Sequence, residues 1–190
     1  DDEVPSITII PFDNKGADED VFYAYGISSD LIADMASAGA IRVAGMKEVE
    51  DLGDIPFKNK AKELNTRYVS TGSLWKMGDQ FQLSIELHDT KESTVVWSDR
   101  WQEKWENLPI IKEKLSSSLL ETLNTKPKVE SSIVNNNTEA YEYYLKAKFK
   151  LDNEALTKEN LSLSRSLAEK AIELDPLFME PRMVLMSTYA

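Results

Sequence analysis

The chain contains no cysteine and only one histidine, His88. The absence of cysteine excludes disulfides, thiolate nucleophiles and cysteine-based zinc or iron–sulfur sites. A single histidine cannot build a multi-histidine metal centre. Because a cysteine-free chain folds in reducing and oxidising compartments alike, this absence does not choose between cytoplasm and periplasm. We expect no metal site and no cofactor.

Basic residues are scarce relative to acidic ones. There are 22 Lys and Arg against 33 Asp and Glu, so the net charge is −11. Nucleic acids and anionic membrane surfaces are bound through positively charged faces, and Lys and Arg occur here only singly or in scattered pairs. No apolar run approaches the ~20 residues that span a bilayer. The composition predicts no nucleic-acid partner and no membrane insertion of this segment.

The two ends predict a piece of a longer protein. Residues 1–3 are acidic and lack the basic flank of a signal peptide. Residues 183–190 stop within a helical pattern. If a helical array is cut there, apolar surface is left exposed at the Ala190 end, which predicts a homodimer or a domain swap in the isolated segment.

The first 125 residues alternate between the periodicities of strands and helices. Residues 80–88 alternate most cleanly, with Phe81 to Leu87 on the inward face at every second position and His88 on the outward face. The predicted elements are a strand over 4–11, a loop over 13–20, a helix from Ile27 to Gly39 preceded by Gly26, a strand over 41–44, a helix over 57–65, strands over 67–76, 80–88 and 95–101, and a helix from Leu108 to Leu123. This order predicts an α/β (α+β) fold with a mixed sheet of about five strands and helices on one face.

The last third of the chain follows a helical period. Residues 126–137 contain Pro127 and an asparagine run, which indicates a linker. Helices are predicted over 139–151 and 160–174, and a third from Met179 or Glu180. We therefore expect a domain over 1–125, a linker over 126–137 and a helical region over 138–190.

This helical region resembles a tetratricopeptide repeat. The residues that carry the resemblance are Ala147, Ala168, Ala171, Ile172, Leu174, Asp175 and Pro176. The loop over 152–159 is longer than the family pattern, so the region corresponds to one irregular repeat and the start of a second. The resemblance implies a groove that binds a protein or peptide partner. The candidate contact residues, all on the first helix, are Tyr141, Tyr143, Tyr144 and Phe149.

The first domain resembles the TolB-type amino-terminal domain and the related FlgO-like families. The matching stretches are residues 9–14, 25–31, 61–74, 87–90 and 97–101. The two resemblances together are similar to the carboxy-terminal half of bacterial signalling proteins that carry an adenylate/guanylate cyclase, a winged-helix domain or a kinase at the amino end. They imply a non-catalytic regulatory segment of a membrane-anchored protein, attached to an adenylate/guanylate cyclase or another output domain, and favour the periplasm over the cytoplasm.

Other clusters give weaker signals. The acidic residues within 13–20 and 48–54 do not follow the EF-hand spacing, so we interpret both as solvated. No serine near His88 sits on a nucleophile elbow, and the glycines form no phosphate-binding loop. Trp97 and Trp101 share one strand face, which makes them either core or an exposed partner patch. We expect no catalytic residues. The alternatives are an envelope-associated structural protein of the TolB/FlgO type and a small-ligand-sensing domain.

Overall fold

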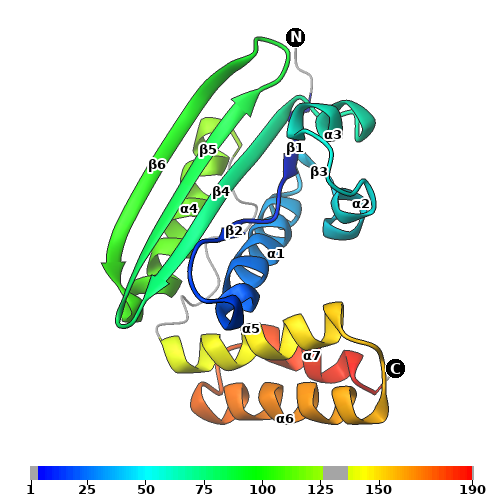
Figure 1. Cartoon of the computed structure of the whole chain (residues 1–190), viewed down its shortest axis with the longest axis vertical. Coiled ribbons are helices and arrows are strands. Elements are labelled where there is room, and N and C mark those ends of the chain that lie inside the picture. Colours follow the sequence, from blue (N-terminus) through cyan, green and yellow to red (C-terminus); the bar gives the residue numbers. More distant parts are fainter. Residues whose placement is uncertain (1–3, 126–136, 190) are drawn as a thin grey trace.

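The computed structural model describes residues 4–125 and 137–189. A sheet with its helices forms the upper part of the molecule, and a layer of three helices lies beneath it (Figure 1). The first of these three helices along the chain packs against the upper part. The predicted linker over 126–137 falls outside the described residues, apart from Asn137.

The sheet is mixed, with the strand order β3-β1-β4-β5-β6 and a short β2 paired to β4. β1 runs parallel to β3 and β4, whereas β4, β5 and β6 form an antiparallel meander. The strands are β1 Ser6–Ile9, β2 Asp13–Asn14, β3 Arg42–Val43, β4 Tyr68–Met77, β5 Gln80–Asp89 and β6 Thr94–Lys104. These findings confirm the predicted α+β class.

The hairpin between β4 and β5 forms where the sequence predicts it. Gly78 adopts a positive φ of 63° in the connection, a conformation that glycine takes without steric cost. The alternation in β5 is also confirmed, because Phe81, Leu83, Ile85 and Leu87 are all buried. A register shift lies between Leu87 and His88, opposite Val95 and Trp97.

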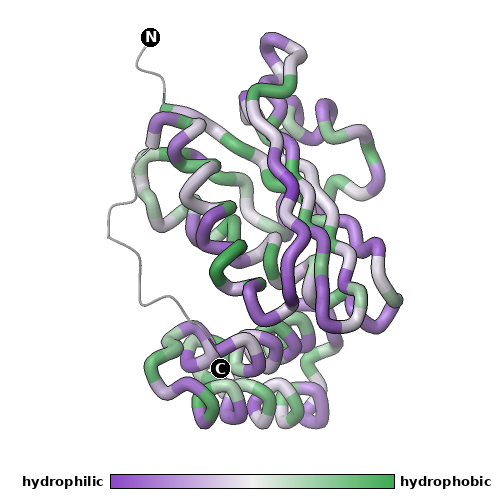
Figure 2. Tube along the Cα trace, turned by 90° about the vertical axis from the view of Figure 1, so that its left-hand side faces the viewer, coloured by the Kyte–Doolittle hydropathy of each residue, from purple (hydrophilic) through white to green (hydrophobic). Residues whose placement is uncertain are grey.

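Helices cover both faces of the sheet, not one as the sequence analysis predicts. The helices of this part are η1 Asp18–Asp20, α1 Val21–Ala38, α2 Met46–Asp51, α3 Phe57–Glu63, η2 Trp105–Asn107 and α4 Leu108–Thr122. α1 and α4 pack on the face lined by Leu83 and Leu87, as Figure 2 shows from the side. α3 lies against the other face near β1, where the Phe57 ring lies 4.7 Å from the ring of His88. His88 is therefore not a surface residue, since only 15% of its side chain is exposed.

One helix begins earlier than predicted, and another is not predicted from the sequence at all. α1 begins at Val21, six residues before Ile27, so Gly26 lies inside the helix and does not precede it. α2 was not predicted, because its acidic residues are interpreted as a solvated stretch. Its start is fixed by the Glu48 carboxylate, which accepts a hydrogen bond of 2.9 Å from the backbone N–H of Gly45.

The lower layer consists of α5 Thr138–Asn153, α6 Lys158–Leu174 and α7 Glu180–Ser187. Asn137 caps α5, since its side-chain oxygen accepts a hydrogen bond from the backbone N–H of Ala140 at 3.0 Å. α5 and α6 pack through the buried alanines Ala147, Ala168 and Ala171, which let two helices approach closely. These are residues that carry the repeat resemblance. The resemblance to tetratricopeptide repeats itself stays a prediction.

Candidate functional site: the junction between the sheet and the helical layer

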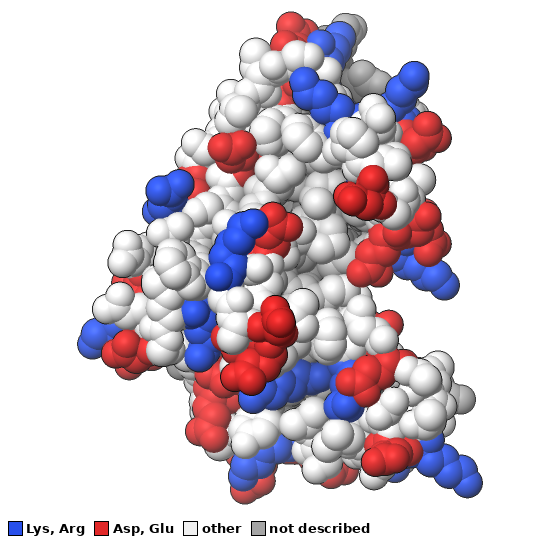
Figure 3. All heavy atoms as spheres, in the orientation of Figure 1, with Lys and Arg blue, Asp and Glu red and all other residues white. Residues whose placement is uncertain are grey.

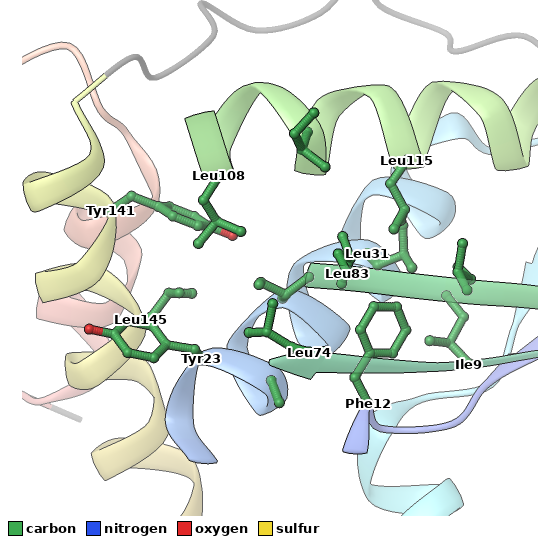
Figure 4. Close-up of a cluster of buried hydrophobic side chains, with 14 of the residues drawn as sticks. Ile9, Phe12, Tyr23, Leu31, Leu74, Leu83, Leu108, Leu115, Tyr141 and Leu145 are labelled. Carbon is green, nitrogen blue, oxygen red and sulfur yellow. The ribbon is translucent and has the colours of Figure 1, made fainter. Parts of the chain in front are cut away.

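The hydrophobic core does not end where the helical layer begins. One cluster of buried side chains extends from Ile9 and Leu83 in the sheet to Tyr141 and Leu145 in α5. Figure 4 shows Tyr141 and Leu145 of α5 pointing toward this cluster, with Leu108 of α4 beside Tyr141 and Tyr23 of α1 beside Leu145. The division of the chain at residues 125 and 138 stays a prediction, because the packing joins the two parts.

Gly26 is the point of closest approach between α1 and α5. A Cβ atom at Gly26 would lie 2.5 Å from Cδ2 of Leu145 and 3.2 Å from its Cγ. Leu145 is fully buried, so it has little room to move. The absence of a side chain at Gly26 therefore lets the two helices pack in direct contact.

A buried carboxylate of α1 accepts hydrogen bonds from α5. The hydroxyl of Tyr141 donates to Oδ2 of Asp30 at 2.8 Å, and the hydroxyl of Tyr144 donates to Oδ1 at 2.6 Å. Burial raises the pKa of Asp30 above its usual value, although the Lys112 ammonium opposes this shift. Both tyrosines have their pKa raised as well, first by burial and then by the Asp30 carboxylate. They are therefore protonated donors throughout the physiological range.

Lys112 of α4 completes this group. Its ammonium lies 2.8 Å from Oδ2 of Asp34, one helical turn after Asp30 on α1. Burial lowers the pKa of Lys112, but the carboxylates of Asp30 and Asp34 outweigh burial and raise it. Ser116 also donates to Asp34, at 2.5 Å. A cation from α4 thus balances the charge that α1 places in the junction.

A second carboxylate connects the same two layers, but here the acid lies on α5 and its donors lie in the sheet part. Glu142 of α5 accepts a hydrogen bond of 2.9 Å from the hydroxyl of Tyr23 in α1, and another from the indole N–H of Trp105 in η2. Each layer therefore contributes one acid that accepts two aromatic donors from the other. We call these pairs the Asp30 clamp (Asp30, Tyr141, Tyr144) and the Glu142 clamp (Glu142, Tyr23, Trp105).

The structure separates the four predicted partner residues into two pairs. Tyr141 and Tyr144 are each 4% exposed and form the Asp30 clamp, so they have almost no surface to offer a partner. Tyr143 and Phe149 are half-buried. The ring of Phe149 lies 5.4 Å from that of Tyr25 in α1, and the ammonium of Lys146 lies 5.8 Å from the Tyr143 ring. Whether any of the four binds a partner stays untested.

Sequence reasoning did not identify Asp30, Lys112 or Glu142 as a group. The only signals were acids on predicted helices, and those acids look like ordinary solvated positions until the fold brings the aromatic donors to them. Trp97 and Trp101, by contrast, lie on the predicted common face. They oppose Leu87 and Leu83 and pack at the margin of the core, with their rings 6.5 Å apart.

The carboxylates of Asp30 and Glu142 each accept two hydrogen bonds from aromatic donors, and these bonds fasten α5 to α1 and η2. Within residues 4–125 and 137–189, no group of three or more His, Cys, Asp or Glu side chains is placed to hold a metal ion. Over the same residues, no helix is long and apolar enough to cross a membrane.

The helical layer carries exposed apolar side chains. Met179, the residue before α7, and Met183 and Met186 within it follow one another at helical spacing and are 61%, 70% and 73% exposed. Leu163 of α6 and Leu177 before α7 are also exposed. Contiguous apolar surface of this kind marks interaction sites in soluble proteins. We call the three methionines the α7 stripe.

No family model matches the chain. A curated protein from Rhizobium meliloti (strain 1021), named "Putative adenylate cyclase 3", is 26% identical over 125 residues, which cover 64% of this chain and 21% of that protein. The chain thus spans about a fifth of the length of this relative.

Among solved structures, the chain is similar to TolB from Acinetobacter baumannii, with a TM-score of 0.48 and 15% identity over 64% of this chain and 28% of that one. It is also similar to lipoprotein GNA1162 from Neisseria meningitidis, with a TM-score of 0.46 and 16% identity over 63% of this chain and 96% of that one. Both TM-scores lie below 0.5, so these likenesses carry no argument about function.

Proposed function

We propose that this segment is a non-catalytic binding and scaffolding module of a larger bacterial signalling protein. The observation that carries the proposal is the pair of clamps, because they fix the helical layer to the sheet with reciprocal hydrogen bonds over a shared core. A layer held in this way presents its outer surface in one orientation, which a scaffold requires. The chain matches about a fifth of the length of the protein named "Putative adenylate cyclase 3", and this match supports placing the segment beside an output domain.

The proposal assigns the partner contact to the exposed side of the helical layer. The exposed apolar groups of this layer are the α7 stripe, Leu163 and Leu177, and Tyr143 is half-buried, whereas Tyr141 and Tyr144 hold the junction. Methionine side chains are flexible and polarisable, so they adapt to an apolar partner surface. Attachment to a cyclase or another output domain, membrane anchoring and a periplasmic location belong to the same proposal.

The test is affinity capture with the 190-residue chain as bait, in three forms: wild type and two variants. One variant carries Met183→Lys and Met186→Lys, and the matched control carries Ser166→Lys at an exposed position of α6. A protein that wild type and control retain and the methionine variant loses supports the proposal. If every enriched protein binds all three baits equally, the helical layer is not the binding surface.

The mass of the bait in solution must be measured in the same experiment. A homodimer that the Met183→Lys, Met186→Lys variant abolishes would mean that the α7 stripe binds a second copy of this chain. Circular dichroism of each variant shows whether it is folded. An exposed apolar-to-lysine change away from the core is expected to alter the free energy of unfolding by no more than about 0.5 kcal/mol.

A further inference from the structure

β6 is an unpaired edge of the sheet. Among the described residues it pairs only with β5, and Figure 1 shows no element on its outer side. It is eleven residues long, and every residue except Trp97 and Trp101 is exposed. A long edge strand carries a row of free backbone N–H and C=O groups, which can pair with another strand.

The register with β5 determines which face each β6 side chain occupies. Trp97 opposes Leu87, Asp99 opposes Ile85, Trp101 opposes Leu83 and Glu103 opposes Phe81. All four partners on β5 are buried core residues. The core-side edge of β6 therefore alternates between an aromatic ring and a carboxylate.

The other face of β6 has the opposite charge. Ser98 opposes Glu86, Arg100 opposes Ser84, Gln102 opposes Gln82 and Lys104 opposes Gln80. The charged residues here are both basic. From Trp97 to Lys104 the edge thus has an acidic face toward the core and a basic face away from it.

This separation of charge disfavours pairing between two copies. Side chains directly opposite each other in paired strands lie on the same face of the sheet, about 4.5–5.5 Å apart. In a two-fold symmetric dimer the two edges pair antiparallel and both core faces lie on the same side, so acids of one edge meet only acids of the other and bases meet only bases. Whichever register brings charged residues opposite each other, they repel.

We propose that β6 accepts an extended segment of a partner protein whose charge pattern is the reverse of its own. Basic residues of that segment lie opposite Asp99 and Glu103, and apolar residues lie beside Trp97 and Trp101. An acidic residue of the segment lies opposite Arg100. The backbone pairing supplies affinity and the alternate side chains supply specificity. This site belongs to the sheet and is independent of the proposed function of the helical layer.

The core side of the new strand has an apolar surface to cover. Both tryptophans are half-exposed, and Ile110 on the adjoining α4 is 40% exposed. Aliphatic side chains at the two aromatic positions would bury part of these groups. An uncharged edge would not distinguish one partner from another, whereas Asp99, Arg100 and Glu103 select the order of charges.

The experiment is a titration of the ¹⁵N-labelled chain, followed by amide NMR, with two synthetic heptapeptides. For antiparallel pairing, the matched peptide is Lys-Thr-Val-Glu-Lys-Thr-Val and the reversed-charge peptide is Glu-Thr-Val-Lys-Glu-Thr-Val. We expect the matched peptide to shift the amides of β6 and to bind on the order of tenfold more tightly than the reversed one, because three cross-strand pairs change sign. The variant Asp99→Lys with Glu103→Lys should invert this preference.

Four results would overturn the proposal. The first is that neither peptide shifts the β6 amides, and the second is that both bind equally. The third is that a matched peptide with alternate backbone nitrogens methylated binds as well as the unmodified one, because strand pairing requires those N–H groups. Concentration-dependent shifts of β6 amides without peptide would mean that copies pair despite their like charges, which also contradicts it.

Discussion

At the scale of single residues, the junction depends on positions whose chemistry looks ordinary in the sequence. Gly26 matters for the side chain it lacks, and Asp30 for the two hydroxyls that reach it from residues 111 and 114 positions away. An unpaired buried carboxylate is costly, so the tyrosines and the Lys112 ammonium are what make Asp30 tolerable there. Both residues connect α1 to α5.

Gly26→Ala should destabilise the protein, although the same change usually stabilises a helix by about 0.5–1 kcal/mol. The new Cβ overlaps Leu145, and overpacking of a core typically costs about 1–3 kcal/mol. In a Leu145→Ala background the contacts with Cδ2 and Cγ disappear and only the 3.3 Å approach to Cβ remains, so Gly26→Ala should then destabilise the protein less. Urea unfolding of the four proteins in this double-mutant cycle measures the coupling. Equal effects of Gly26→Ala in both backgrounds would show that the helices adjust without strain.

Asp30 should give the protein a recognisable dependence of stability on pH. Because its folded pKa is raised above the unfolded value of 3.8, its contribution to stability is greatest below that value and decreases as the pH rises through the folded pKa. Asp30→Asn removes this titration and leaves the others in place. The free energy of unfolding of the variant minus that of wild type should therefore increase as the pH rises above the unfolded value of 3.8 and level off above the folded pKa. A decrease would mean that Lys112 and the tyrosines lower the pKa of Asp30 instead.

At the scale of helices and strands, the features predicted correctly are those that a local sequence pattern determines. The strands β4, β5 and β6 lie within a few residues of their predicted bounds, since alternation and the Gly78 turn are encoded locally. The start of α1 was misplaced because glycine usually interrupts a helix, whereas Gly26 is kept by its contact with Leu145, 119 residues later in the chain. The face covered by α3 was likewise unpredictable, because it depends on which side of β1 the chain crosses.

The candidate site shows the same division. The helical pattern correctly predicted the helix that carries Tyr141 and Tyr144, and both were candidate contact residues for a partner. It could not show that their hydroxyls point to an acid of α1, since nothing local to α5 or α1 records that contact. Exposure and burial of a tyrosine on a helix face are set by what packs there, so two of the four predicted contact residues, Tyr141 and Tyr144, are buried in the junction.

At the scale of the whole molecule, the sheet and the helical layer should unfold together. One buried cluster spans both, and the two clamps add hydrogen bonds that neither layer satisfies alone. We expect wild type to lose tryptophan fluorescence, which reports only on residues 75–105, at the same urea concentration at which the amides of α6 lose protection from hydrogen exchange. Asp30→Ala combined with Glu142→Ala leaves four aromatic donors without acceptors, at about 1–3 kcal/mol for each buried group. In that variant α6 should lose protection at a lower urea concentration than the sheet.

Separate transitions in wild type would contradict this prediction, because they would mean that the shared core does not couple the layers. A control with Glu169→Ala, at an exposed position of α6, should keep the two transitions together.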